Sequence, residues 1–155
     1  MKIQFFFAVA IPLLFGNVAH AWTTSTSDNV WRSGWGQGTA EAEVTHGSGN
    51  NIYVACQDGS LINSSITISL AGKGPNGNSI LMVFDAGNIE SISVNKFGSI
   101  ESDSRSGDAT FRYVIDRLKK HKTVLVRFGD GRESTFTLNG ASKAIGNCKS
   151  TFPSM

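Results

Sequence analysis

Polar and apolar residues alternate along most of the chain from residue 39 to residue 138. In residues 65–70, Ile66, Ile68 and Leu70 alternate with serine and threonine, which is the period of a strand with one buried face. Clusters of Gly, Asn, Asp and Pro separate such segments at intervals of about ten residues. The predicted strands span residues 39–45, 52–56, 65–70, 80–84, 89–94, 97–100, 124–128 and 134–138. This spacing predicts a mainly β fold, either an antiparallel β-sandwich or a partly open barrel.

One amphipathic helix is predicted at about residues 108–121. Its apolar positions recur at helical spacing and fall on one face: Phe111, Val114, Ile115 and Leu118. Ser106 and Asp108 supply N-cap side chains and a negative charge at the expected start of the helix. A short C-terminal helix is predicted at residues 141–145, after Asn139 and Gly140.

The N-terminus has the three parts of a secretory signal peptide over residues 1–21. Lys2 precedes an apolar run over residues 3–15, and the small-residue pattern Ala19-His20-Ala21 follows. The run is shorter than the roughly 20 residues that span a bilayer, although an uncleaved short anchor is an alternative. We therefore expect a periplasmic or secreted protein with one domain, residues 22–155. Its first part, residues 22–38, is rich in Trp, Gly and Ser and is expected to be loop.

Two cysteines, Cys56 and Cys148, lie in the exported part and are 92 positions apart. Two thiols in an oxidising compartment usually pair, so a disulfide is predicted. Two buried free thiols are the alternative. A catalytic cysteine would need a positioned histidine, and neither His46 nor His121 lies in a recognisable nucleophile motif.

Charge is nearly balanced, with 14 Lys and Arg against 12 Asp and Glu. This balance excludes a strongly basic nucleic-acid coat and an acidic disordered tail. One basic stretch nevertheless indicates an anionic partner, either another protein or an envelope component: Arg112, Arg117, Lys119, Lys120, Lys122, Arg127 and Arg132. A solvated helix face explains the same residues without any partner. Few aromatic residues interleave with them, so nucleic-acid binding is not expected.

No catalytic motif, metal site or cofactor site is predicted. The cysteines and histidines are isolated from one another, no G-x-S-x-G is present, and the glycine-rich segments lack the strand–loop–helix context of a phosphate cradle. A pair of carboxylates for glycoside hydrolysis stays open as an alternative, with these candidates: Asp85, Glu90, Glu101, Asp103 and Asp108.

The last third of the chain carries a family resemblance. Phe136, Leu138, Gly140, Ala144 and Ile145 form an F-x-L-x-G-x-x-x-A-I element. This element resembles the closing module of small exported bacterial proteins of the invasion-associated locus B family and of the periplasmic proteins associated with type VI secretion. The resemblance implies a non-enzymatic exported β protein and transfers no catalytic residue. The N-terminal half departs from it, with one cysteine where the locus B family usually has more.

Together these observations predict an exported, non-enzymatic binding or accessory protein, associated with secretion or host attachment. The first alternative is an inhibitor of a cell-wall hydrolase such as lysozyme, which would insert the Gly72–Asn78 loop or the Gly129–Gly131 hairpin into a cleft. The second alternative is a small carboxylate-dependent hydrolase. The sequence does not give the oligomeric state.

Overall fold

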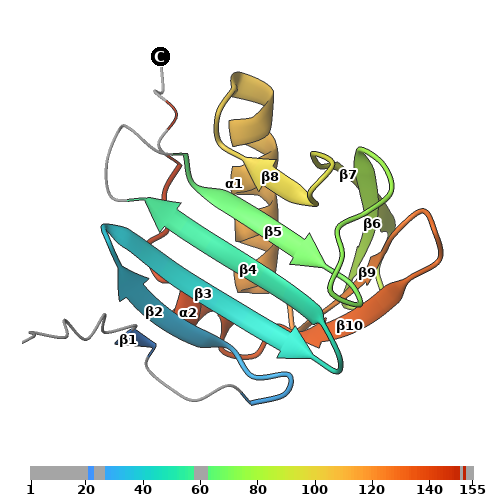
Figure 1. Cartoon of the computed structure of the whole chain (residues 1–155), viewed down its shortest axis with the longest axis horizontal. Coiled ribbons are helices and arrows are strands. Elements are labelled where there is room, and N and C mark those ends of the chain that lie inside the picture. Colours follow the sequence, from blue (N-terminus) through green and yellow to red (C-terminus); the bar gives the residue numbers. More distant parts are fainter. Residues whose placement is uncertain (1–20, 23–26, 58–62, 151, 153–155) are drawn as a thin grey trace, which may run out of the picture.

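A computed structural model describes residues 21, 22, 27–57, 63–150 and 152. It contains two antiparallel sheets and two helices, and the sheets do not close into a barrel (Figure 1). The larger sheet has the strand order β1-β2-β3-β4-β5-β8, with these bounds: Ala21–Trp22, Arg32–Gly36, Thr39–His46, Asn50–Gln57, Ser65–Ser69 and Ser99–Glu101. The smaller sheet has the order β10-β9-β6-β7, with bounds Glu133–Thr137, Thr123–Arg127, Ser79–Phe84 and Ile89–Ser93.

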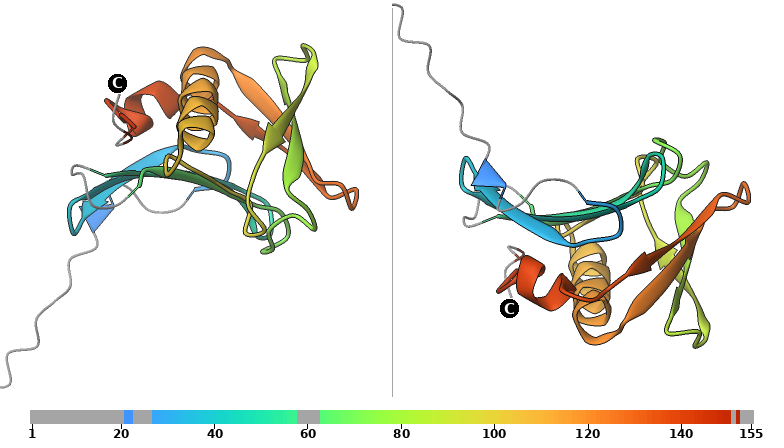
Figure 2. Two further views of the ribbon diagram at one scale, coloured as in Figure 1. Left: turned by 90° about the horizontal axis from the view of Figure 1, so that it is seen from above. Right: turned by 90° about the horizontal axis from the view of Figure 1, so that it is seen from below.

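The core lies between the inner face of the larger sheet and two covering layers. Helix α1 (Arg105–Lys120) lies over one part of this face and the smaller sheet inclines over another, as the side views show (Figure 2). Helix α2 (Ala141–Ile145) lies beside α1. The alternating positions expected to be buried are buried, because each strand turns every second side chain inward. They include Ile52, Val54, Ile66, Ile68, Met82, Val124 and Phe136.

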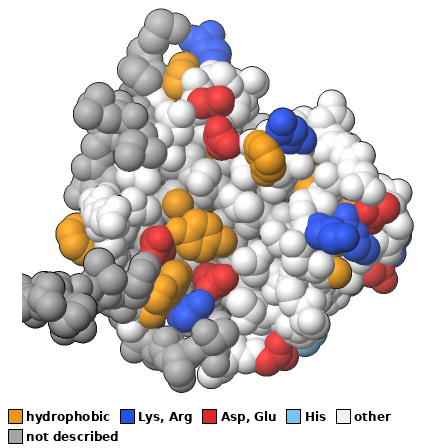
Figure 3. Space-filling model, viewed as in Figure 1, with side chains coloured by type: hydrophobic (Ala, Val, Ile, Leu, Met, Phe, Trp, Pro, Cys, Tyr) orange, Lys and Arg blue, Asp and Glu red, His pale blue; other side chains and the backbone are white. Residues whose placement is uncertain are grey.

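The outer faces of the two sheets differ in chemistry. On the larger sheet, Arg32 lies over the ring of Trp22 and pairs with Glu43 at 2.5 Å, while the Tyr53 hydroxyl bonds Glu41. Figure 3 views this face and shows apolar, acidic and basic side chains mixed on it. Burial, reinforced by the bond to Glu41, raises the pKa of Tyr53. The charged groups named on this face are therefore paired with their own neighbours.

The smaller sheet instead exposes apolar side chains on its outer face. Ile89 is 66% exposed and Leu81 37% exposed, and both lie beside Val83 and Leu125. Strand β6 therefore carries apolar side chains on both of its faces, one buried in the core and the other at the outer surface of the smaller sheet.

Two predictions are wrong, one about the structure of residues 22–38 and one about where the long helix begins. Residues 22–38 are not all loop, because Trp22 belongs to β1 and Arg32–Gly36 form β2. Strand β2 pairs through its backbone with β3, and its two glycines and serine give no hydrophobic alternation to detect. Helix α1 begins at Arg105 rather than near 108, because the Ser104 side chain, not that of Ser106, is the N-cap.

Candidate functional site

Helix α1 has an apolar face toward the core and a charged face toward solvent. The Ser104 hydroxyl accepts a hydrogen bond from the Gly107 N–H at 3.1 Å, which satisfies one free donor of the first turn. Phe111, Val114 and Leu118 are fully buried, as the helical spacing predicts. The cationic side chains on the solvent-facing side of α1 are therefore carried by a helix whose opposite face is buried in the core.

A groove of about 620 Å³ lies between α1 and the C-terminal segment, and we call it the helix–tail groove. Phe111, Ile115 and Phe152 form its apolar lining. Its cationic rim comprises Arg112, Lys119, Lys120 and Lys149. Three of the seven basic residues singled out in the sequence thus line one groove, and Lys149 joins them there.

Three contacts hold the tail that forms one wall of the groove. Cys148 is bonded to Cys56 at the end of β4, as the sequence predicts. The buried Ser64 hydroxyl donates to the Lys149 carbonyl at 3.1 Å. The Lys119 ammonium group of α1 donates to the Gly146 carbonyl, just before the tail, at 2.9 Å. The wall is therefore attached both to the larger sheet and to the helix that it faces.

The rim cations differ in how far they are neutralised. Arg112 pairs with Asp108, whose side chain is only 6% exposed. Burial opposes ionisation of Asp108, yet the hydrogen bonds and the charge of Arg112 outweigh it and lower its pKa. Lys120 pairs with the exposed Asp116 at 2.9 Å, a contact that water screens. Lys119 and Lys149 have no carboxylate partner among the described residues, so the rim keeps a net positive charge.

The other four predicted cations lie away from the helix–tail groove. Arg117 turns toward β7, where it pairs with Glu90 at 3.1 Å. Arg127 pairs with Glu133 across the β9–β10 hairpin at 2.5 Å. Lys122 is exposed after α1. The seven residues therefore do not form a single basic face.

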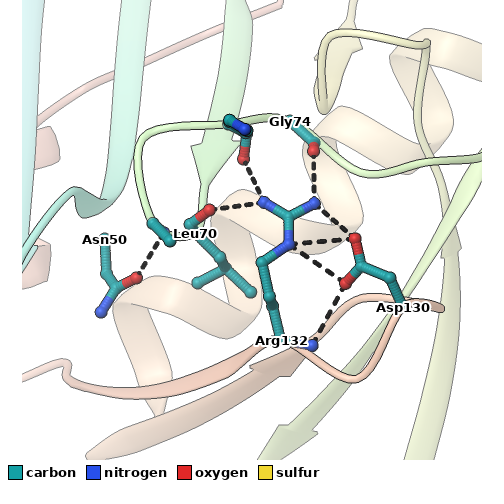
Figure 4. A network of polar contacts seen from close by, with 7 residues as sticks. Asn50, Leu70, Gly74, Asp130 and Arg132 are labelled. Atoms are coloured by element: carbon teal, nitrogen blue, oxygen red, sulfur yellow. Dashed lines mark hydrogen bonds and ion pairs between the residues drawn. The ribbon is translucent and has the colours of Figure 1, made fainter.

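Arg132 connects two loops by binding backbone groups, which its charge in the sequence does not indicate. Its guanidinium donates to the carbonyls of Leu70 at 2.6 Å, Lys73 at 3.2 Å and Gly74 at 2.9 Å, and also pairs with Asp130 (Figure 4). These bonds join the β9–β10 hairpin to the loop between β5 and β6. The two loops that the sequence offered as separate inhibitory loops are thus connected.

Close backbone approaches bring two more turns into the same region. The Gly72 N–H donates to the Gly49 carbonyl at 2.7 Å, and a Cβ on Gly49 would lie 2.5 Å from that nitrogen. A Cβ on Gly74 would lie 2.9 Å from the backbone of Phe97. We call the four turns together, residues 46–50, 70–78, 95–98 and 128–132, the loop end.

The candidate carboxylates of the hydrolase alternative are mostly held by neighbours. Asp85 accepts from the backbone N–H groups of Lys122 and Thr123, at 2.9 and 2.8 Å, and from His121. These backbone bonds, followed by that from His121, lower the pKa of Asp85 to about 2. Such a carboxylate stays ionised near neutral pH and is not suited to general acid catalysis.

The remaining carboxylates of that set are dispersed. Glu90 binds Arg117, Glu101 accepts from Asn95 at 2.8 Å, and Asp108 binds Arg112. Asp103 lines a small polar pocket with Glu101. Within the part of the chain that is described, no group of three or more His, Cys, Asp and Glu side chains is placed to hold a metal ion. No described helix is both long and apolar enough to cross a membrane.

The sequence missed features that depend on contacts between distant segments. Nothing in the local sequence around Lys149 and Phe152 indicates a binding site, because their place against α1 depends on contacts such as the disulfide that return the tail to the body. The pairing of Gly49 with Gly72 carries no local signal, because any turn can contain glycine. The 92-residue cysteine spacing was the one available signal that the tail returns to the body.

Fold and surfaces together define a class: a small protein of two antiparallel sheets whose C-terminal segment is fastened to its body by a disulfide. The chain belongs to the YfjT family, whose model matches residues 29–145. The match runs from before β2 to the end of α2, so Cys148 and the tail wall of the groove lie beyond it. No curated protein and no solved structure matches the chain.

Proposed function

We propose that this protein is an exported, non-enzymatic binding protein whose helix–tail groove accepts an acidic segment of a partner protein. The observation that carries the proposal is the combination, in one groove, of an apolar lining and a cationic rim. An apolar side chain of the partner removes lining surface from water, while its carboxylates face the rim cations. The resemblance to exported proteins of secretion and attachment systems supports an accessory role of this kind.

Export is supported by the signal-like N-terminus and by the disulfide between Cys56 and Cys148. Expression of the full chain in a bacterium with a periplasm, followed by intact-mass measurement of the periplasmic fraction, tests it. We expect a mature chain that begins at Trp22 and is lighter by two hydrogens than its reduced form. Retention of residues 1–21 would contradict cleavage, and accumulation in the cytoplasm would contradict export.

Binding in the groove is tested with a fluorescent peptide that alternates Glu and Phe. The variant Lys120→Glu/Lys149→Glu reverses two rim charges, and we expect its affinity to fall by about tenfold or more. Lys122→Glu/Lys143→Glu, which changes the net charge equally on exposed residues outside the groove, is the matched control. Equal losses in both variants would mean unspecific charge attraction and would contradict the groove as the binding site.

A second candidate function is inhibition of a cell-wall hydrolase such as lysozyme, and the loop end is the observation that favours it. Inhibitory loops bind tightly when their bound shape exists before binding. Arg132 and the Gly49–Gly72 contact join three of the turns, residues 46–50, 70–78 and 128–132, to one another. Inhibition of lysozyme on a cell-wall suspension tests it, and full lysozyme activity at a large excess of this protein would contradict it. No contact specifically favours the carboxylate-dependent hydrolase.

A further inference from the structure

We propose that Lys73, at the loop end, is the side chain that enters the active-site cleft of a cell-wall glycan hydrolase and binds between its catalytic carboxylates. This inference rests on the second proposed function, inhibition, and names the residue and the partner chemistry through which it acts. Three observations support it: a tight turn exposes the Lys73 side chain, neighbouring residues hold the backbone of that turn in place, and the Lys73 ammonium group is unpaired among the described residues.

Lys73 is presented by a tight turn. The turn joins Leu70 to Lys73 by two hydrogen bonds, Leu70 N–H to the Lys73 carbonyl at 3.0 Å and the reverse at 3.3 Å. Its central residues, Ala71 and Gly72, have φ values of 53° and 72°. Both flanking residues of Lys73 are glycines, so no neighbouring side chain along the chain obstructs the ammonium group.

The backbone under Lys73 is fixed from three sides. Arg132 binds the carbonyls of Leu70, Lys73 and Gly74 (Figure 4). The Asn50 side chain accepts from the Ala71 N–H at 2.8 Å, and the Gly49 carbonyl accepts from the Gly72 N–H. These contacts hold Ala71 in a left-handed conformation that a residue with a side chain rarely adopts. A strained position kept in place by its surroundings is typical of binding loops.

The charge of Lys73 is available to a partner. Its ammonium group has no ion pair or hydrogen bond with any described residue. The only acid in the four turns of the loop end is Asp130, and Arg132 already occupies it. On the adjacent turn, Lys96 lies over Phe97, whose side chain is 64% exposed. Among the described residues, the loop end therefore offers the unpaired ammonium group of Lys73 and the exposed ring of Phe97.

This chemistry matches the cleft of a glycoside hydrolase. Such enzymes place two carboxylates on either side of the scissile bond. A lysine ammonium group carries three donors and no acceptor, so it can hydrogen-bond both carboxylates at once. A carboxylate pair is also a site of concentrated negative charge, which steers a cationic loop toward it and makes association sensitive to salt.

The test measures inhibition of a lysozyme with two catalytic carboxylates by the full mature protein. We expect Lys73→Ala to raise the inhibition constant by about 100-fold, because a carboxylate pair buried at the interface loses its cation. Lys122→Ala, an exposed lysine outside the loop end, is the matched control and stays within about twofold. Lys73→Arg keeps the charge and is expected to retain part of the inhibition. Circular dichroism checks that each variant is folded.

A second readout does not depend on folding of the variants. Carbodiimide treatment of the parent protein with the lysozyme joins an amine to a carboxylate in direct contact, and mass spectrometry locates the bond. We expect Lys73 linked to a catalytic carboxylate. Inhibition that survives in folded Lys73→Ala, or a linkage through other lysines only, would overturn the role of Lys73 and leave the inhibitor function standing. Absence of inhibition by the parent protein would overturn both.

Discussion

Single ionised side chains organise the turns of this protein by binding backbone groups. Asp85 accepts two backbone N–H groups and Arg132 donates to three carbonyls. The sequence shows the charge of each residue but not these partners, because backbone atoms are the same at every position. This is why Arg132 was predicted to bind a partner and Asp85 was a candidate catalyst. The alternation of Ile66 and Ile68, in contrast, predicted burial directly.

At the residue scale we predict the effect of Asp85→Asn on the pH dependence of stability. The pKa of Asp85 falls from 3.8 to about 2 on folding, so its ionisation stabilises the folded state above pH ~4. That contribution is lost as the pH falls from about 4 to about 2. Asparagine tolerates the left-handed φ of 48°, keeps one oxygen to accept from the Lys122 and Thr123 N–H groups, and removes the charge. Denaturant unfolding should therefore show a large difference between parent and variant at pH 6 and a small one at pH 2.

Asp116→Asn is the control for this prediction, since Asp116 is exposed and its ion pair with Lys120 is screened by water. It should change the unfolding free energy little at either pH. A difference between parent and Asp85→Asn that is the same at pH 2 and pH 6 would show that the carboxylate charge contributes nothing.

At the scale of elements, most strands and both helices were predictable because each buries an apolar face with a fixed period. Residues 65–69 and 141–145 agree with the expected bounds to within one residue. Strand β2 was not predictable, because it lies near the sheet edge and gains its hydrogen bonds from β3 rather than from apolar burial. The loop end also escaped prediction, because its turns are far apart in sequence.

The turns give a prediction with a matched pair of glycines. Gly49 and Gly38 have similar φ values, 75° and 80°, but a Cβ on Gly49 meets the Gly72 backbone while a Cβ on Gly38 meets nothing within 4 Å. Gly38→Ala should cost about 1–2 kcal/mol for the left-handed backbone alone. Gly49→Ala should cost about 3–4 kcal/mol, because overpacking adds to that strain. Chemical denaturation measures both, and equal costs would contradict the close approach.

At the scale of the whole molecule, the two sheets and α1 share one core, and the tail is attached from outside. The predicted mainly β fold class is confirmed by the two antiparallel sheets. The predicted disulfide between Cys56 and Cys148 indicated that the C-terminal tail packs against the body of the protein. The position of the groove was not predictable, because it depends on where Phe152 and Lys149 come to lie against α1. A one-dimensional pattern does not specify how separate layers pack.

The disulfide gives the prediction at this scale. Replacement of Cys56 and Cys148 by alanine, or reduction of the bridge, should lower the unfolding free energy by about 4–5 kcal/mol through loop closure over 92 residues. The groove should lose its tail wall, so affinity for the acidic peptide should fall with it. Denaturant unfolding and fluorescence anisotropy measure the two effects. If the reduced protein is folded and its affinity for the peptide is unchanged, peptide binding in the groove does not depend on the disulfide.

The same bridge has a consequence for biosynthesis. Cys56 is translated well before Cys148, so the growing chain carries a single thiol with no intramolecular mate while the intervening residues are made. An oxidant that meets the chain in that interval can only cap Cys56 or join it to another chain, since the thiol that it pairs with is not yet present. The native bridge therefore closes only after the C-terminal segment has been synthesised.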